Sequence, residues 1–189
     1  MTEPTMQVSE ATTVLREEAG DAIAVLTMSP MAFWGESRPL DFRLLGTMGA
    51  AASIGLGIAL GTPDRTVWVI DGDGSLLMQL GVVAAVADAA PENYVHVVID
   101  NGIYAISGAQ PTPAPRDWVA LLEGAGYSEA VVCETPDEVR AAVRRDAPGP
   151  RAVVVRCARE RPAYAPGALA ANSEAEAAHI RDGLSTVRV

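Results

Sequence analysis

The feature that most constrains the fold is a regular alternation of short apolar runs and helix-like segments in the second half of the chain. The apolar runs are rich in Val and Ile and cover residues 66–70, 94–99, 130–133 and 151–157. The segments between them have apolar residues at helical spacing and cover residues 75–89, 116–123 and 137–145. This alternation is typical of a parallel sheet covered on both faces. The sequence therefore predicts a doubly wound α/β fold with a mostly parallel sheet.

The first half of the chain is less regular. Ser9 is placed to cap a helix that ends at Gly20, and residues 22–28 have the composition of a strand. Residues 29–41 contain two prolines and no periodicity, so we predict a long loop of the kind that is often functional. A further helix is expected at 48–60.

The two ends of the chain differ in composition. Residues 1–159 contain all the predicted strands and are expected to form one domain. Residues 160–189 are rich in Ala, Pro and Glu, and they are expected to form a tail or packing arm with one weak helix near 173–181.

Charge and length exclude several classes of protein. The 14 basic and 24 acidic residues give a net charge of −10, which opposes binding to nucleic acid or to an anionic membrane surface. The longest weakly polar stretch, 48–60, is shorter than the roughly 20 residues that cross a bilayer. Because no charged leader opens the sequence and two cysteines do not make a disulfide framework, we expect a cytoplasmic protein.

Polar and glycine residues follow two of the predicted strands. Strand 66–70 runs into Asp-Gly-Asp-Gly-Ser at 71–75, and strand 94–99 runs into Asp-Asn-Gly-Ile-Tyr at 100–104. Carboxylate and amide oxygens suit Mg²⁺, while glycines and helix-start amides suit a phosphate. Either motif alone is compatible with a simple turn. However, Asp73 and Asn101 are 28 residues apart with one helix and one strand between them, which favours a shared site at one sheet edge.

The run from 72 to 101 resembles the metal and diphosphate motif of thiamine-diphosphate (ThDP) enzymes. The resemblance implies that Asp73 and Asn101 bind Mg²⁺ through their side chains and that Ile103 binds it through its carbonyl oxygen. It also implies a cofactor-binding set around the diphosphate, which comprises Gly72, Asp73, Gly74, Ser75, Asn101, Ile103 and Tyr104.

Residues 38–60 look like the corresponding segment of sulfopyruvate and phosphonopyruvate decarboxylases. By that resemblance the Gly46 carbonyl accepts a hydrogen bond from the cofactor's aminopyrimidine, and Met48 wedges under the bent cofactor. An unbranched Met suits an irregular gap, although without the metal motif this residue is more typical of a core position at a helix start. The chain departs from the family's Ser-Thr-Gly-x-Gln pattern at Ile106, which makes that wall more apolar and leaves the substrate open.

The resemblance covers about residues 11–157 and corresponds to the diphosphate-binding half of these enzymes. It implies one subunit of a split ThDP- and Mg²⁺-dependent decarboxylase that acts on a small 2-oxo acid. A separate alpha-type chain with a pyrimidine-binding domain is then the expected partner in a hetero-oligomer. A carboligase of the same architecture and a non-catalytic regulatory subunit are the alternatives.

Two further features have competing interpretations. The glycine-rich run 55–61 is similar to a dinucleotide-binding motif, but it lies within a predicted helix rather than between a strand and a helix. Arg38 and Arg43 are candidates for attracting an anionic substrate, or for surface and ion-pair roles.

Overall fold

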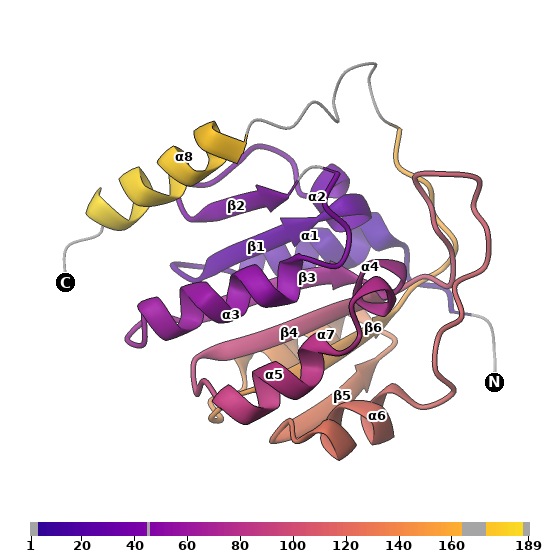
Figure 1. The fold of residues 1–189 in the computed structure, drawn as a ribbon. Helices are drawn as coiled ribbons and strands as arrows, with labels where there is room; N and C mark the ends of the chain where they lie inside the picture. Colours follow the sequence, from indigo (N-terminus) through magenta and orange to yellow (C-terminus); the bar gives the residue numbers. More distant parts are fainter. Residues whose placement is uncertain (1–3, 45, 164–172, 187–189) are drawn as a thin grey trace.

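A six-stranded sheet forms the centre of the fold in the computed structural model, which describes residues 4–44, 46–163 and 173–186 (Figure 1). The strand order is β2-β1-β3-β4-β6-β5, and every neighbouring pair is parallel. The strands are β1 (Ile23–Thr27), β2 (Asp41–Leu44), β3 (Val67–Gly72), β4 (Tyr94–Asp100), β5 (Glu129–Cys133) and β6 (Arg151–Arg156). The predicted doubly wound α/β fold is therefore confirmed.

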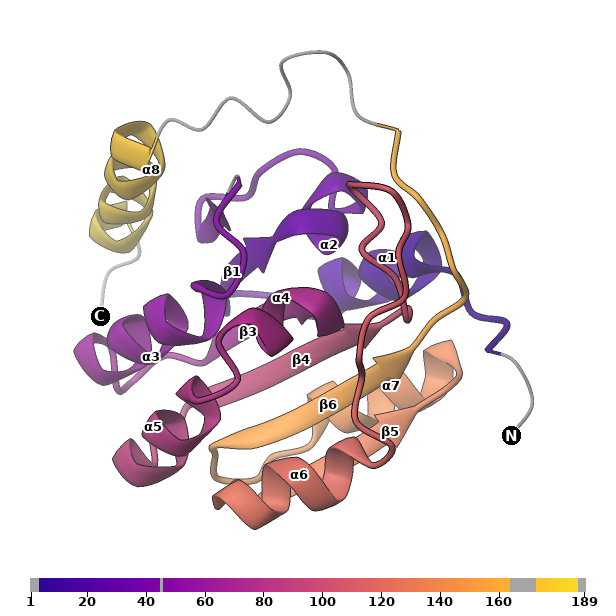
Figure 2. The same cartoon turned by 45° about the vertical axis from the view of Figure 1, so that its right-hand side comes forward.

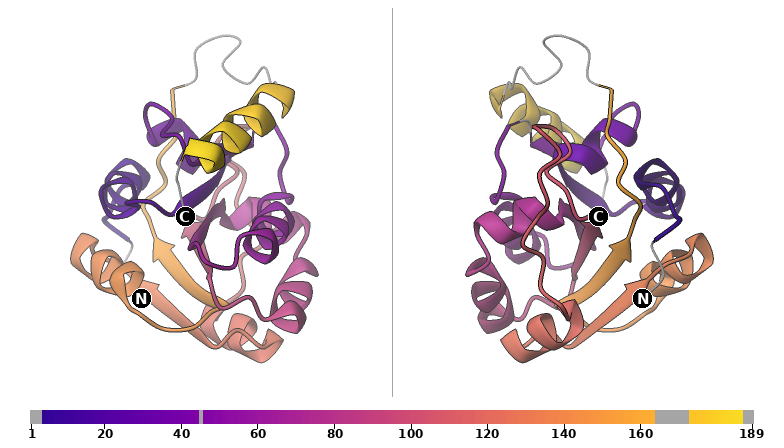
Figure 3. Two further views of the ribbon diagram at one scale, coloured as in Figure 1. Left: turned by 90° about the vertical axis from the view of Figure 1, so that its left-hand side faces the viewer. Right: turned by 90° about the vertical axis from the view of Figure 1, so that its right-hand side faces the viewer.

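Helices cover both faces of this sheet (Figures 2 and 3). The helices are α1 (Val8–Glu18), α2 (Met28–Phe33), α3 (Ala51–Gly61), α4 (Asp73–Met78), α5 (Val82–Ala89), α6 (Trp118–Ala125), α7 (Pro136–Arg144) and α8 (Ser173–Thr186). Successive side chains of a strand point to opposite faces, so Ile70 packs in the core under α1 and α7 while Val69 packs in the core under α3 and α5. Among the described residues, no helix has the length and apolar character needed to cross a membrane.

Several predicted elements differ from the observed ones. The predicted loop 29–41 is shorter than expected, because α2 occupies its start and β2 begins at its end, which leaves residues 34–40 as the loop. Pro30 lies in the first turn of α2, where a missing N–H costs no helical bond. The predicted helix 75–89 is two helices, since Gln79 leaves the helical conformation. The helix predicted from 48 begins at 51, because Gly49 adopts a left-handed φ of +83°.

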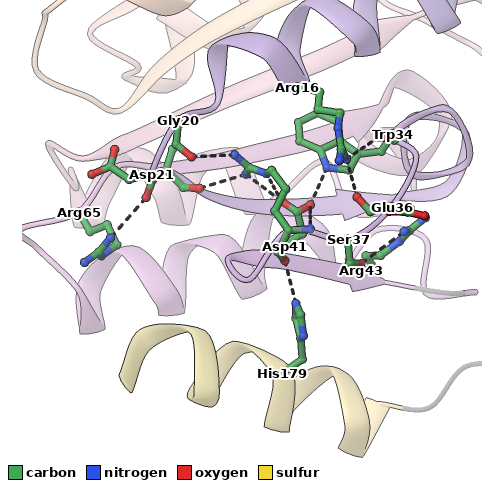
Figure 4. A network of polar contacts seen from close by, with 12 residues as sticks. Arg16, Gly20, Asp21, Trp34, Glu36, Ser37, Asp41, Arg43, Arg65 and His179 are labelled. Carbon is green, nitrogen blue, oxygen red and sulfur yellow. Dashed lines mark hydrogen bonds and ion pairs between the residues drawn. The ribbon is translucent and has the colours of Figure 1, made fainter. Parts of the chain in front are cut away.

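Asp41 holds together the segment between α2 and β2 (Figure 4). Its carboxylate accepts hydrogen bonds from Trp34 Nε1 at 2.7 Å and from Arg38 N at 2.8 Å, and it forms an ion pair with the Arg38 guanidinium at 2.7 Å. That guanidinium also donates to the carbonyls of Gly20 and Ala22. Arg38 is thus engaged in structural contacts.

Arg43 has a similar structural role. Its guanidinium donates to the carbonyl oxygens of Gly35 and Met31, each at 2.9 Å. Of the two interpretations of the arginines in this segment, the structure favours internal pairing.

The predicted arm at 160–189 includes α8, which lies along β2 at the edge of the sheet (Figure 3). Ile180 is buried against the sheet, and His179 Nε2 lies 2.8 Å from the carbonyl oxygen of Arg38. The helix extends further than the predicted 173–181. The other parts of the arm, 164–172 and 187–189, lie outside the described residues.

Candidate cofactor site

A cavity of about 260 Å³ lies beyond the carboxyl ends of β1, β3 and β4. It is lined by residues 28–30, Met48, 72–75, Met78, Ile99, Asn101 and 103–107. Eight of the nine predicted site residues are in this set. The ninth, Gly46, has a left-handed φ of +69° and is not part of the lining. The predicted residues that follow β3 and β4 thus all line one cavity, as the position of the strand ends in the sequence indicated.

Asp73 is the first residue of α4 and is only 2% exposed. Its Oδ2 accepts hydrogen bonds from Thr112 Oγ1 at 2.6 Å and from Gly102 N at 3.1 Å. These bonds join the end of β3 to the chain that follows β4. Burial raises the pKa of Asp73 to about 6, against the opposing effect of the hydrogen bond from Thr112. A bound cation would stabilise the ionised carboxylate at this position.

Asn101 and Ile103 lie beside Asp73 at the end of β4. The Asn101 Oδ1 atom accepts a hydrogen bond from Ile103 N at 3.2 Å, and Gly102 between them has a φ of +69°. Asn101 and Ile103 are each 6% exposed.

The oxygen atoms of Asp73, Asn101 and Ile103 would suit Mg²⁺ as part of a mixed set of ligands. The described residues contain no cluster of three or more His, Cys, Asp and Glu side chains that could hold a metal ion. A hard cation at this site would therefore need a mixed set of one carboxylate, one amide oxygen and backbone oxygens, completed by oxygens of a bound ligand. Mg²⁺ is commonly held in this way together with phosphate oxygens.

Further acids add negative charge to this edge of the sheet. Asp71 is completely buried, and its Oδ2 has no hydrogen-bond partner among the described residues. Burial raises the pKa of Asp71 to about 7 and also raises the pKa of Asp100. Trp118 Nε1 donates to Asp100 at 3.1 Å. The negative potential of these acids attracts cations. An anionic ligand would bind here only together with a metal ion.

Met48 is held close to α4 by its neighbour. Gly49 N donates to Ser75 Oγ at 3.0 Å, and a Cβ atom at Gly49 would lie 3.1 Å from Gln79 Cβ. The left-handed Gly49 thus lets the turn before α3 approach α4 closely. The Met48 side chain consequently lines the cavity rather than starting a core helix.

Gly74 has a steric role that the sequence did not reveal. A Cβ atom at this position would lie 2.5 Å from the Tyr104 ring and 3.0 Å from Thr112 Cγ2. Glycine therefore allows the chain after β4 to pack on α4, which brings Tyr104 to the cavity.

Sequence reasoning missed the contributions of residues 28–30 and 105–107 to the lining. Residues 28–30 follow β1, which pairs with β3, so the same strand-end argument could have found them. Met28 has a left-handed φ of +50°, which is uncommon for a residue other than glycine. Residues 105–107 lie far enough beyond β4 that their position depends on tertiary contacts.

A parallel sheet with a cavity beyond the carboxyl ends of its strands is the arrangement in which open α/β domains bind their ligands. Residues 23–157 match the family described as "Thiamine pyrophosphate enzyme, C-terminal TPP binding domain", and the chain belongs to this family.

Solved structures show the same fold. An enzyme from Mycobacterium smegmatis, assigned as thiamin diphosphate-dependent, is 26% identical with a TM-score of 0.69, over 81% of this chain and 32% of that one. Benzoylformate decarboxylase from Polynucleobacter necessarius is 20% identical with a TM-score of 0.63, over 81% and 33% of the two chains, and shows likeness of fold.

Curated relatives include phosphonopyruvate decarboxylase of Streptomyces hygroscopicus, 43% identical over 57% of this chain and 27% of the relative. Two sulfopyruvate decarboxylase beta subunits are each 46% identical. That of Methanocaldococcus jannaschii matches over 42% of both chains, and that of Methanothermobacter thermautotrophicus over 48% of this chain and 49% of the relative. The matches span between about a quarter and a half of these relatives. The resemblance to ThDP-dependent decarboxylases that the motifs indicated is confirmed.

Proposed function

We propose that this chain is the diphosphate- and metal-binding subunit of a split ThDP- and Mg²⁺-dependent 2-oxo-acid decarboxylase. The observation that carries the proposal is that Asp73, Asn101 and Met48 line the same cavity. Family membership supplies the cofactor class, and the similarity to decarboxylases supplies the reaction type.

The metal would be held by the Asp73 carboxylate, the Asn101 amide oxygen and the Ile103 carbonyl oxygen. The bonds from Thr112 and Gly102 fix one oxygen of Asp73, so that the carboxylate is oriented before the metal binds. Asn101 is oriented by its own bond from Ile103 N. These residues bind and orient; bound ThDP would supply the electron sink that lets a 2-oxo acid lose carbon dioxide.

The remaining predicted residues would shape the cofactor site. Gly72 and Gly74 allow the diphosphate to approach the backbone, and Ser75 lies in the same wall. Tyr104, packed on Gly74, would form the side of the site. Met48 would support the bent cofactor. Gly46 would meet its pyrimidine end, which we place beyond the cavity formed by this chain alone.

A partner subunit is part of the proposal. Several similar proteins are named as beta subunits, which supports an alpha-type chain that carries the pyrimidine-binding domain. The substrate would be a small 2-oxo acid of the sulfopyruvate or phosphonopyruvate kind. Since Arg38 and Arg43 are engaged in structural contacts, the partner is the expected source of a cation for a doubly anionic substrate.

The test compares this chain alone with the chain co-purified with its alpha-type partner. Each sample receives ThDP, Mg²⁺ and a panel of sulfopyruvate, phosphonopyruvate and pyruvate, and carbon dioxide release is measured. We expect turnover by the pair only. Turnover by the chain alone would refute the split enzyme. Carbon dioxide release that yields ligation products in place of the simple aldehyde would favour a carboligase. Failure of the pair to bind ThDP would favour a regulatory subunit.

A further inference from the structure

The chain beyond β6 runs back past the cavity, and its residues after Cys157 lie outside the part that the family match covers. We call residues 157–163 the C-terminal strap. Cys157 N donates to Asp100 O at 2.9 Å, and Ala158 N donates to Met6 O at 2.8 Å. The Glu160 carboxylate accepts hydrogen bonds from Ser9 N and Ser9 Oγ, both at 2.8 Å. The start of the strap is thus fixed to β4 and to the beginning of α1.

The strap lies beside the chain that follows β4, which we call the site hairpin, residues 102–112 (Figure 2). Tyr104 N donates to Gln110 O at 2.9 Å and Thr112 N donates to Gly102 O at 3.1 Å, so the segment folds back on itself. Its base is tied to Asp73 through Gly102 N and Thr112 Oγ1. Its tip, residues 105–109, contains the cavity-lining residues 105–107.

Arg161 connects the strap to this tip. Its Nε donates to the carbonyl oxygen of Ala105 at 3.1 Å, and its Nη2 donates to that of Ser107 at 2.9 Å. The other hydrogen bonds of the tip, such as Ser107 Oγ to Gln110 Oε1 at 3.0 Å, stay within the site hairpin. Among the described residues, therefore, the hydrogen bonds that join the tip to another part of the chain are those of Arg161.

The guanidinium suits this task. Nε and one Nη lie on the same edge of a rigid plane, so Arg161 can reach two carbonyl oxygens at once, whereas a lysine ammonium has no such fixed pair of donors. Glu160, next to it, is anchored by Ser9, so the guanidinium is presented from a fixed backbone.

We propose that Arg161 is a positioning residue that fixes the site-hairpin tip and, through it, the 105–107 wall of the cofactor cavity. The proposal rests on the proposed function in that the cavity is taken to hold ThDP. Without Arg161 the tip would leave its position part of the time. The apparent Kd of a ligand rises in inverse proportion to the fraction of molecules in which its site is complete.

The experiment uses the full chain with Arg161→Ala, Arg161→Lys and, as a control, Arg159→Ala. Arg159 is exposed on the same strap and takes part in none of the hydrogen bonds or ion pairs found among the described residues. Two readouts are measured: amide hydrogen exchange of the site hairpin in the chain without ligands, and the Kd for ThDP with Mg²⁺ in the complex with the partner.

For Arg161→Ala we expect exchange at Tyr104, Ser107 and Ala109 to become at least about fivefold faster, while the β3 and β4 amides keep their rates. The Kd for ThDP should rise about fivefold. Arg161→Lys should recover part of both effects, and the control should match the wild type. An unchanged melting temperature would show that the fold is intact.

Three results would overturn the proposal. Unchanged exchange in Arg161→Ala would show that other contacts hold the tip. Faster exchange with an unchanged Kd would show that the tip does not form the cofactor wall. An equal effect of Arg159→Ala would assign the change to charge alone. Absence of ThDP binding by the wild-type complex refutes the proposed function instead, and the exchange rates still decide whether Arg161 fixes the tip.

Discussion

Two buried aspartates, Asp41 at the start of β2 and Asp73 just beyond the end of β3, have different surroundings. Asp41 is fully buried and Asp73 is 2% exposed. Asp41 faces the Arg38 guanidinium and the Trp34 N–H, so its charge is balanced within the chain (Figure 4). Asp73 accepts hydrogen bonds from the Thr112 hydroxyl and from backbone amides, and none of the ion pairs among the described residues includes it.

The difference separates a carboxylate that is paired within the chain from one that we propose binds a metal. A buried charge is expensive unless it is paired, and Asp41 has its counter-ion built in. Asp73 and the adjacent Asp71 have none, and burial raises the pKa values of both groups. The chain therefore contains buried acids without an internal counter-ion, which is consistent with the metal site that we propose.

The largest effect is expected where the internal pair is broken. Asp41→Asn leaves the Arg38 guanidinium without its counter-ion and should lower the free energy of unfolding by about 3–5 kcal/mol. Urea denaturation of the ligand-free chain measures the change. Glu17→Gln is the matched control, because Glu17 pairs with Arg140 at the surface and should contribute less than about 1 kcal/mol. Equal effects of the two substitutions would contradict the structural role of Asp41.

A buried base extends the contrast to pH. His96 is fully buried, its Nδ1 lies 3.0 Å from the Tyr127 hydroxyl, and its Nε2 has no partner among the described residues. Burial lowers the pKa of His96 to about 4 from a usual value of 6.5. Between these values the unfolded chain binds a proton that the folded chain does not. Stability should therefore fall as the pH drops from about 6.5 to 4.

The contribution of His96 over that range should be about 3 kcal/mol. Unfolding free energies of the wild type and His96→Gln, measured between pH 4 and 7, isolate it. Because Asp71 and Asp73 are present in both proteins, their opposite dependence on pH cancels in the difference. Parallel curves for the two proteins would contradict the prediction, because they would show that His96 has the same pKa in the folded and the unfolded chain.

On the functional side, Asp73→Asn should separate stability from binding. The amide keeps an oxygen for Thr112 and Gly102 but loses the charge, so the ligand-free chain should be as stable as the wild type within about 1 kcal/mol. Affinity for ThDP with Mg²⁺ should fall at least about 100-fold, or roughly 2.7 kcal/mol. Titration calorimetry of the complex measures it, with the exposed Asp88→Asn as control. Wild-type affinity in Asp73→Asn would remove Asp73 from the metal site.

The same contrast explains what could be predicted from sequence. The strands β3, β4, β5 and β6 were predictable because each is a short apolar run between helical patterns, and the residues after β3 and β4 follow from the strand-end rule. Local patterns do not contain the pairing of Asp41 with Arg38 and Trp34, so the segment around it looked like a loop and β2 was missed. Long-range packing decides such segments.

The site shows the same limit. Residues 72–75 and 101–104 were predictable because their position depends on two neighbouring strands alone. The 105–107 wall depends on Arg161, which comes more than fifty residues later in the sequence and belongs to no motif. Likewise, Met48 is a cavity residue because Gly49 bonds to Ser75, a contact that helical periodicity cannot reveal.

The smallest effect is expected where geometry rather than charge is changed. Met48 lines the cavity without a polar contact to a phosphate or a metal, so Met48→Ala should leave the Kd for ThDP within about threefold of the wild type. If the side chain supports the reactive shape of the cofactor, kcat of the complex should still fall about tenfold, because the loss affects orientation rather than anchoring. Met78→Ala is the matched control, since Met78 lines the same cavity but is 56% exposed. An equal fall in kcat in the two variants would show that Met48 contributes only apolar surface to the cavity. A fall confined to Met48→Ala would show that this side of the cavity sets the geometry of the cofactor, while Asp73 sets its attachment.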